Sequence, residues 1–187
     1  MNFARIIYSL LIIVSAYSAY YLYLGRQELN LQVTPDLELP TLSGKNVDNT
    51  SYNQSGIRSY RVTAKNLDHY AKSGDTVFEY PVLFVFKEGK VEEWEINADR
   101  GVLDKKHVLR LYGNVLAKNL LPNASFDTMA TDEMLIHLDN RDFWADNPVV
   151  LVGPQFENKG QAMKGNFGEN VATLYNNVQG RYETLTP

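Results

Sequence analysis

Residues 77–86 read VFEYPVLFVF, and this stretch decides the fold class. Most of its side chains are β-branched or aromatic, a composition that is typical of strands. Because successive side chains of a strand point to opposite faces, alternation places five of them together: Phe78, Tyr80, Val82, Phe84 and Phe86. A polar turn, KEGK at 87–90, and a second alternating run, VEEWEINA at 91–98, follow at hairpin spacing. The pattern predicts an antiparallel hairpin with Trp94 on its inner face.

The same pattern continues on both sides of this hairpin. From residue 51 onward no run keeps a 3.6-residue period, and turn residues divide the sequence into short strands. Strand–turn–strand units recur weakly at a spacing of about 30 residues. The sequence therefore predicts an all-β domain over residues 51–187, built as a sandwich, a jelly roll or a β-solenoid. Further strands are predicted at 60–64, 108–117, 134–138, 149–152, 162–167 and 170–175.

The N-terminal segment has a different character. Residues 6–24 read IIYSLLIIVSAYSAYYLYL, without a charge, proline or glycine, and a helix of this length spans roughly 28 Å. It predicts one transmembrane helix, with residues 1–5 in the cytoplasm and the main domain outside the cytoplasmic membrane. A signal peptide cleaved after Ser18 is the alternative, but the apolar run continues to Leu24 and favours a retained anchor. Residues 25–50 are predicted to be a linker, or an extended segment that becomes ordered on a partner.

Composition excludes several classes of function. The net charge is −4, so no basic surface for nucleic acid is expected. The chain has no cysteine, which excludes disulfides, thiolate metal sites and a cysteine nucleophile. His69, His107 and His137 are isolated and lack metal-ligand spacing, so no metal and no cofactor are predicted.

Two carboxylates provide the best enzymatic alternative. Glu93 and Glu95 alternate with Trp94 and are predicted on the solvated face of their strand. Paired carboxylates also occur in glycosidases, so a carbohydrate-active enzyme is the alternative to a solvated face. No nucleophile elbow or phosphate-binding loop is present. The sequence predicts a protein that is not an enzyme.

Several short motifs, in this order and spacing behind an N-terminal anchor, resemble the LptC family and, more broadly, the OstA-like β-domain. These motifs are SYRVTA at 59–64, YPVL at 80–83, ADR at 98–100, LYGNV at 111–115, TD at 131–132 and MKGN at 163–166. The resemblance implies a twisted antiparallel β-jelly roll that is open along its long axis. It also implies a periplasmic domain that receives lipopolysaccharide and passes it outward. The implied partners are lipopolysaccharide, an inner-membrane ABC transporter of the LptB/LptF/LptG type and a bridge protein of the LptA type.

The resemblance, together with strand alternation, predicts which residues meet lipid and partners. An apolar groove would shelter acyl chains that must not remain in water. The predicted partner edges are Gly56 with Tyr60 toward the transporter, and Val171 with Tyr175 toward the bridge protein. The predicted groove residues are Phe78, Tyr80, Val82, Phe84, Trp94, Ala172, Leu174 and Tyr182.

Two glycines and one alternative function remain open. Gly56 and Gly153 are predicted to be turn residues with special backbone angles. Their functional alternatives are a docking residue at Gly56 and an opening of the groove mouth at Gly153. A scaffold that joins its partners through sheet edges without touching lipid is the alternative to a lipid carrier.

Overall fold

The computed structural model describes residues 14–18, 20, 38–122 and 124–182. The chain divides into two units, residues 1–38 and 39–187. In the first unit, residues 14–18 and 20 are helical, and the rest of the predicted transmembrane segment lies outside the described residues. Among the described residues, no helix has the length and apolarity to cross a membrane.

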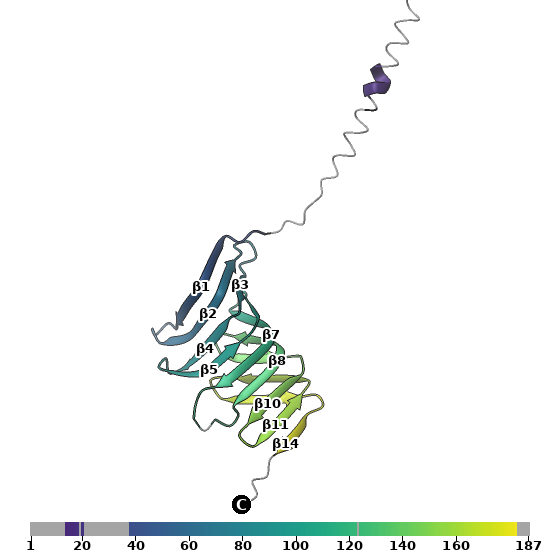
Figure 1. Cartoon of the computed structure of the whole chain (residues 1–187). Coiled ribbons are helices and arrows are strands. Elements are labelled where there is room, and N and C mark those ends of the chain that lie inside the picture. The colour runs from purple at the N-terminus through teal and green to yellow at the C-terminus, as the bar shows by residue number, and fades with distance from the viewer. Residues whose placement is uncertain (1–13, 19, 21–37, 123, 183–187) are drawn as a thin grey trace, which may run out of the picture. The chain divides into compact units, whose positions relative to one another are not determined.

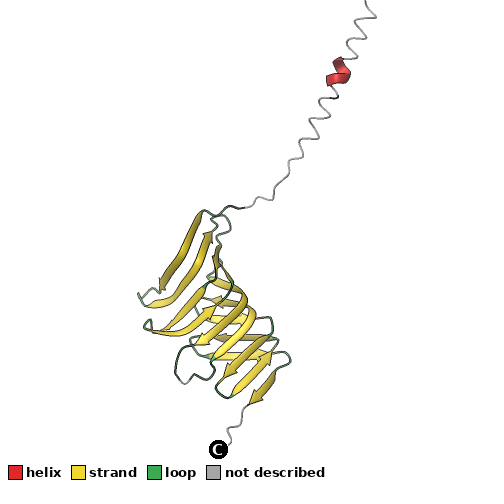
Figure 2. Ribbon diagram, viewed as in Figure 1, coloured by secondary structure: helices red, strands yellow, loops and turns green. Residues whose placement is uncertain are grey.

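The second unit consists of strands joined by turns (Figure 2). Within residues 38–182 the chain forms one antiparallel sheet of 14 strands. The first seven strands are β1 (Leu42–Tyr52), β2 (Arg58–His69), β3 (Thr76–Glu79), β4 (Val82–Lys87), β5 (Val91–Asn97), β6 (Arg100–Leu103) and β7 (Val108–Asn119). The remaining strands are β8 (Thr128–His137), β9 (Asp142–Ala145), β10 (Val149–Gly153), β11 (Phe156–Gly160), β12 (Ala162–Asn166), β13 (Val171–Tyr175) and β14 (Gln179–Tyr182).

The sheet bends into two layers because its long strands pair with different neighbours along their length. In β7 the first half pairs with β6 and the second half with β5. In β8 the first half pairs with β10 and the second half with β9. β2 likewise pairs with β4 and then with β3. One layer therefore contains β6, β9, β12 and β13. The other contains β5, β10, β11 and β14, which are labelled in Figure 1.

The chain turns from one layer to the other at corners that all lie on one side of the sheet. Several of these corners contain residues with positive φ, a backbone conformation that residues other than glycine and asparagine rarely adopt. Because a corner interrupts the pleat, it also changes which side chains point inward. The corner residues with positive φ are Asn46, Tyr80, Gly113, Asn114, Asn176 and Asn177.

The corner at Tyr80 corrects the prediction for residues 77–86. This stretch forms two strands, β3 and β4, because Tyr80 has φ 50° and Pro81 follows it. After the corner Leu83 and Val85 point into the interior, while Val82 and Phe84 are half-buried on the outer side. Tyr80 itself is 58% exposed. Strict alternation is therefore wrong for Tyr80, Val82 and Phe84.

Alternation does hold for the regular parts of β5 and β7. Trp94 and Ile96 on β5 are completely buried, as are Leu109 and Leu111 on β7. Residues on the two layers join in one hydrophobic cluster that continues from Val62 to Phe167. The all-β prediction is confirmed.

The predicted linker extends too far. Its residues 42–50 belong to β1, which pairs with β2 from Leu42 opposite His69 to Tyr52 opposite Arg58. The sequence of β1, LSGKNVDNTSY, lacks apolar alternation, and most of its side chains are exposed. Backbone hydrogen bonds to β2, rather than an apolar face, hold this strand in place.

Candidate functional site

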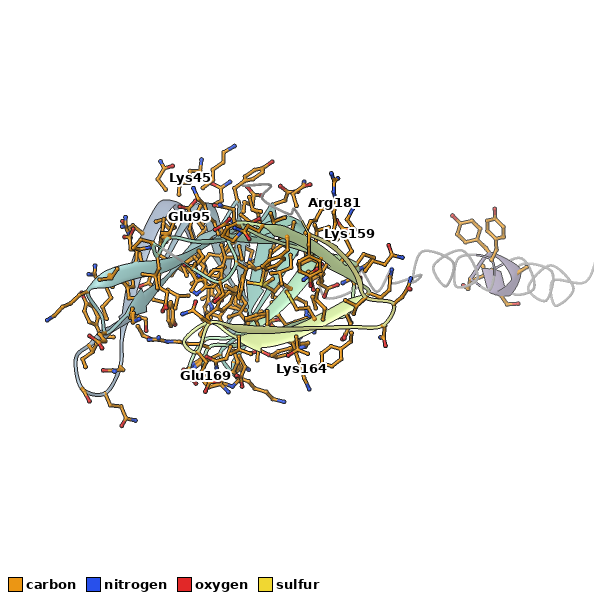
Figure 3. All side chains as sticks on the ribbon, turned by 90° about the horizontal axis from the view of Figure 1, so that it is seen from below. Lys45, Glu95, Lys159, Lys164, Glu169 and Arg181 are labelled. Carbon is orange, nitrogen blue, oxygen red and sulfur yellow. The ribbon has the colours of Figure 1, made fainter. Side chains whose placement is uncertain are left out.

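The space between the two layers is the candidate site, and we call it the interior. It is lined by apolar side chains from both layers, and Glu93 is the one charged residue that is buried among the described residues. Figure 3 shows Lys159 and Arg181 pointing away from one layer and Lys164 pointing away from the other. The interior is therefore apolar, and the outer surface is polar and compatible with water. Its fully buried members include Leu83, Trp94, Ile96, Leu109, Leu111, Met129, Met134, Phe143, Met163 and Phe167.

An aromatic cluster fills the middle of the interior. The Trp94 ring lies 5.0 Å from the Phe167 ring and 5.5 Å from the Phe126 ring, centroid to centroid. Phe143 extends the cluster, with its ring 4.4 Å from Phe167. Trp94 also donates a hydrogen bond from Nε1 to the Phe167 carbonyl oxygen, at 3.2 Å. The cluster joins the layers because Trp94 is on β5 while Phe143 is on β9.

Glu93 corrects the prediction of a solvated acidic face. Its side chain is only 1% exposed. On β4, Val85 pairs with Trp94 and Phe86 with Glu92, so Glu93 is the extra residue of a β-bulge. The bulge buries Glu93 and Trp94 although they are consecutive. Glu93 Oε1 accepts a hydrogen bond from Asn170 Nδ2 at 2.7 Å, and Oε2 has no partner among the described residues.

The C-terminal end of the interior is less completely covered. Ala172 and Leu174 on β13 pack against the core but remain partly exposed. Tyr182 on β14 is 71% exposed, and its ring lies 6.3 Å from that of Phe156. Apolar side chains therefore reach the last strands of the stack, where no further described strand covers them.

The two ends of the sheet differ from the predicted partner edges at one residue. Among the described strands, β13 pairs with β12 alone, so Val171 and Tyr175 lie on an edge strand. At the other end the edge strand is β1. Tyr60 lies one strand further in, between Ser51 of β1 and Val85 of β4. Its prediction as an edge residue is therefore wrong.

The two predicted turn glycines have different physical roles. Gly56 has φ 72° in the β1–β2 turn, as predicted, and a Cβ there would meet nothing within 4 Å. Gly153 ends β10 and has no positive φ, so the turn explanation is wrong for it. A Cβ at Gly153 would collide with the Phe156 ring. Close packing, not turn conformation, requires glycine at this position.

The structure thus brings together only some of the predicted groove residues. Phe78 and Trp94 lie in the interior, Ala172 and Leu174 line its C-terminal end, and Tyr182 lies exposed beside it. Phe126, Phe143 and Phe167 also lie in the interior and were not predicted as groove residues. The alternation of DFWA at 142–145 is the one signal that marks Phe143 as an inward residue. Among the described residues no group of three or more His, Asp or Glu side chains is placed to hold a metal ion.

A stack of bent antiparallel strands around an apolar interior defines a β-jelly roll of open type. This fold is similar to the crystal structure of LptH, the LptA homologous periplasmic component of the conserved lipopolysaccharide transport device from Pseudomonas aeruginosa. The TM-score is 0.52 at 10% sequence identity, over 68% of this chain and 95% of that chain. At this identity the similarity shows the fold alone.

Sequence comparison gives the family. The family model described as "Lipopolysaccharide-assembly, LptC-related" matches residues 8–183. The chain is 32% identical to the Lipopolysaccharide export system protein LptC of Escherichia coli (strain K12), over 81% of this chain and 80% of that protein. It is 25% identical to the protein of the same name from Haemophilus influenzae, over 77% of each chain. This chain therefore belongs to the LptC-related family.

Proposed function

We propose that this protein carries lipopolysaccharide from the inner membrane toward the outer membrane. The observation that carries the proposal is the continuous apolar interior, which extends to half-buried residues on the last strands of the stack. Exposing acyl chains to water costs about 25 cal/mol per Å² of apolar surface, so a sheltered path strongly favours transfer. The names of the similar proteins from Escherichia coli and Haemophilus influenzae support the same cargo.

The sheet edges supply the contacts to partners in this proposal. β1 and β13 are edge strands whose outer backbone groups can pair with a strand from another protein. We assign β1, with the Gly56 turn, to an inner-membrane ABC transporter of the LptB/LptF/LptG type. We assign β13, through Val171 and Tyr175, to a bridge protein of the LptA type. A partner of the same fold stacked on β13 would also cover Ala172 and Leu174, which this chain leaves partly exposed.

The proposed location follows from the N-terminal sequence. One transmembrane helix at residues 6–24 would anchor the chain in the inner membrane, with the N-terminus in the cytoplasm and the β-domain in the periplasm. The protein is proposed to act without enzymatic chemistry and without a cofactor, so the energy for directional transport would come from the transporter.

The proposal is tested by a photo-crosslinking amino acid placed in the full-length protein in living cells. The structure offers a matched pair, since Phe78 is a buried aromatic residue of the interior and Phe84 an aromatic residue of the outer side. Lipopolysaccharide adducts are expected at Phe78 and Ala172 and not at Phe84. Equal capture at Phe78 and Phe84, or no capture at Phe78, would overturn the proposal.

A scaffold that never touches lipid is the second candidate, because side chains of the aromatic cluster fill the middle of the interior. If the protein is only a scaffold, the bridge partner should be recovered with it at the normal level although Phe78 and Ala172 give no lipopolysaccharide adduct.

The edge assignment has its own test, Tyr175→Pro, which should reduce recovery of the bridge partner because proline removes a backbone donor from β13. Recovery at the wild-type level would show that β13 is not the contact.

A further inference from the structure

One side of the two layers carries the hairpin turns, opposite the corners, and we call this side the mouth. A loop from one layer closes the mouth midway along the stack. This loop, residues 167–170, joins β12 and β13. It keeps a hydrogen bond to its own layer, from the Phe167 N–H to the Arg141 carbonyl oxygen at 3.0 Å, and makes three more with β5 and β7 of the other layer. The layers are therefore joined at the mouth as well as at the corners.

The first part of this closure is apolar. Phe167 is fully buried, packs on Trp94 and Phe143, and accepts the hydrogen bond of the Trp94 indole. Almost no empty space remains beside it. The void between Tyr60, Val85, Ile136, Leu138 and Phe167 measures about 10 Å³, which is at the lower limit for one water molecule. An acyl chain cannot pass this point while Phe167 stays in place.

The second part is a polar chain from one layer to the other. Asn119 Nδ2 donates to Asn170 Oδ1 at 3.1 Å, and Asn170 Nδ2 donates to Glu93 Oε1 at 2.7 Å. The closed loop also has an energetic cost, because the buried Oε2 atom of Glu93 has no partner among the described residues. A buried oxygen without a partner regains a hydrogen bond when water reaches it. Lifting the loop would hydrate Glu93, which lowers the free-energy cost of opening.

We propose that the 167–170 loop is a latch, which closes the interior midway and lifts when an acyl chain passes from the Phe78 end toward the Tyr182 end. This inference rests on the proposed transport function and adds its point of control. Glu93 and Asn170 are positioning residues, since they hold the latch and do not need to touch the cargo. This role requires Glu93 to face the loop, and the bulge provides that orientation because it turns the carboxylate inward instead of toward solvent.

The first test needs no cargo. In the full-length Trp144→Phe background Trp94 is the remaining tryptophan, so its emission reports the latch alone. Asn170→Asp keeps the side-chain shape but sets a second carboxylate beside Glu93, and like charges repel. We expect the Trp94 emission to shift to longer wavelength and acrylamide quenching to rise roughly twofold as the latch opens. Asn177→Asp, at an exposed corner with the same positive φ, is the matched control and should change neither. Wild-type emission in Asn170→Asp would overturn the latch.

The second test closes the latch reversibly. Because the chain has no cysteine, Glu93→Cys with Asn170→Cys creates one thiol pair across the mouth. A short bis-methanethiosulfonate reagent bridges the pair, and a reductant releases it. The control pair is Lys164→Cys with Thr173→Cys, which are opposite each other on β12 and β13 and do not cross the mouth.

Photo-crosslinking in cells then reports the position of lipopolysaccharide on each side of the latch. With the latch bridged, we expect adducts at Phe78 to persist and adducts at Tyr182 to fall to roughly a tenth, because the open population is removed. Reduction should restore them, and the control pair should have no effect. Unchanged adducts at Tyr182 in the bridged protein would overturn the latch while leaving the transport function intact. Absence of adducts at Phe78 in both the bridged and the reduced protein would instead overturn the transport function, and the latch with it.

Discussion

The middle and the C-terminal end of the same stack are built differently. In the middle, Trp94, Phe143 and Phe167 are completely buried and join the two layers. At the C-terminal end, Leu174 is half-buried and Tyr182 is largely exposed. Solenoid-like stacks normally end in a polar cap that protects the last repeat. The comparison indicates that stability resides in the middle, and that the uncovered end is available for contact.

The largest expected loss of stability comes from a substitution in the middle of the stack. Trp94→Ala removes the ring that contacts both Phe126 and Phe167, and should lower the free energy of unfolding by about 3–5 kcal/mol. Urea unfolding of the full-length protein in detergent, followed by circular dichroism, measures the change. Tyr80→Ala is the control, since this aromatic ring is 58% exposed and its loss should cost about 0.5 kcal/mol or less. Equal costs for the two variants would contradict the conclusion that the aromatic cluster around Trp94 stabilises the fold.

The next effect concerns the edge strand β13. A Cβ at Gly165 on β12 would collide with the Val171 carbonyl oxygen and the Phe143 ring. Gly165→Ala should therefore displace β13 and cost about 1–3 kcal/mol. Hydrogen exchange should accelerate in β13 and remain slow in β7.

Gly56→Ala is the matched glycine control. Its Cβ would meet no atom, but its positive φ predicts a cost of about 1–2 kcal/mol. That cost should stay in the β1–β2 turn, so exchange in β13 should not change. Faster exchange of β13 in Gly56→Ala would show that the two ends of the sheet are coupled.

A smaller effect compares two leucines. Leu174→Ala removes a half-buried side chain and should cost about 1 kcal/mol. Leu111→Ala removes a completely buried one and should cost about 2–5 kcal/mol. Urea unfolding of both variants under the same conditions gives the ratio. A cost at Leu174 as large as that at Leu111 would mean that the C-terminal end is already fully packed.

The smallest expected effect concerns an exposed ion pair on the outer side of β1 and β2. Two hydrogen bonds from Arg61, each 2.8 Å, hold the pKa of Asp48 below its ordinary value. A pKa that is lower in the folded than in the unfolded protein stabilises the fold above the unfolded pKa, and this contribution disappears as pH falls through the folded pKa. Asp48→Asn should lower the Tm slightly at neutral pH, and the difference from wild type should vanish in acid. A difference that grows in acid would contradict this assignment.

The sequence by itself determined the all-β class, the family and the faces of the regular strands. Inward positions such as Trp94, Ile96 and Leu111 follow from alternation, because the pleat of a strand is a local property of the backbone. Composition also determined that no disulfide or thiolate chemistry is available, since the chain has no cysteine.

Only the tertiary structure decided where alternation is interrupted. The corner at Tyr80 turns Val82 and Phe84 outward, and the bulge opposite Val85 turns Glu93 inward. The corner and the bulge both depend on which strands pair with β4 and β5. Because those partner strands can be distant in sequence, they leave no periodic pattern in the sequence itself. The same reason explains β1, which is held by hydrogen bonds to β2 without an apolar pattern of its own, and the contact between residues 93 and 170 at the mouth.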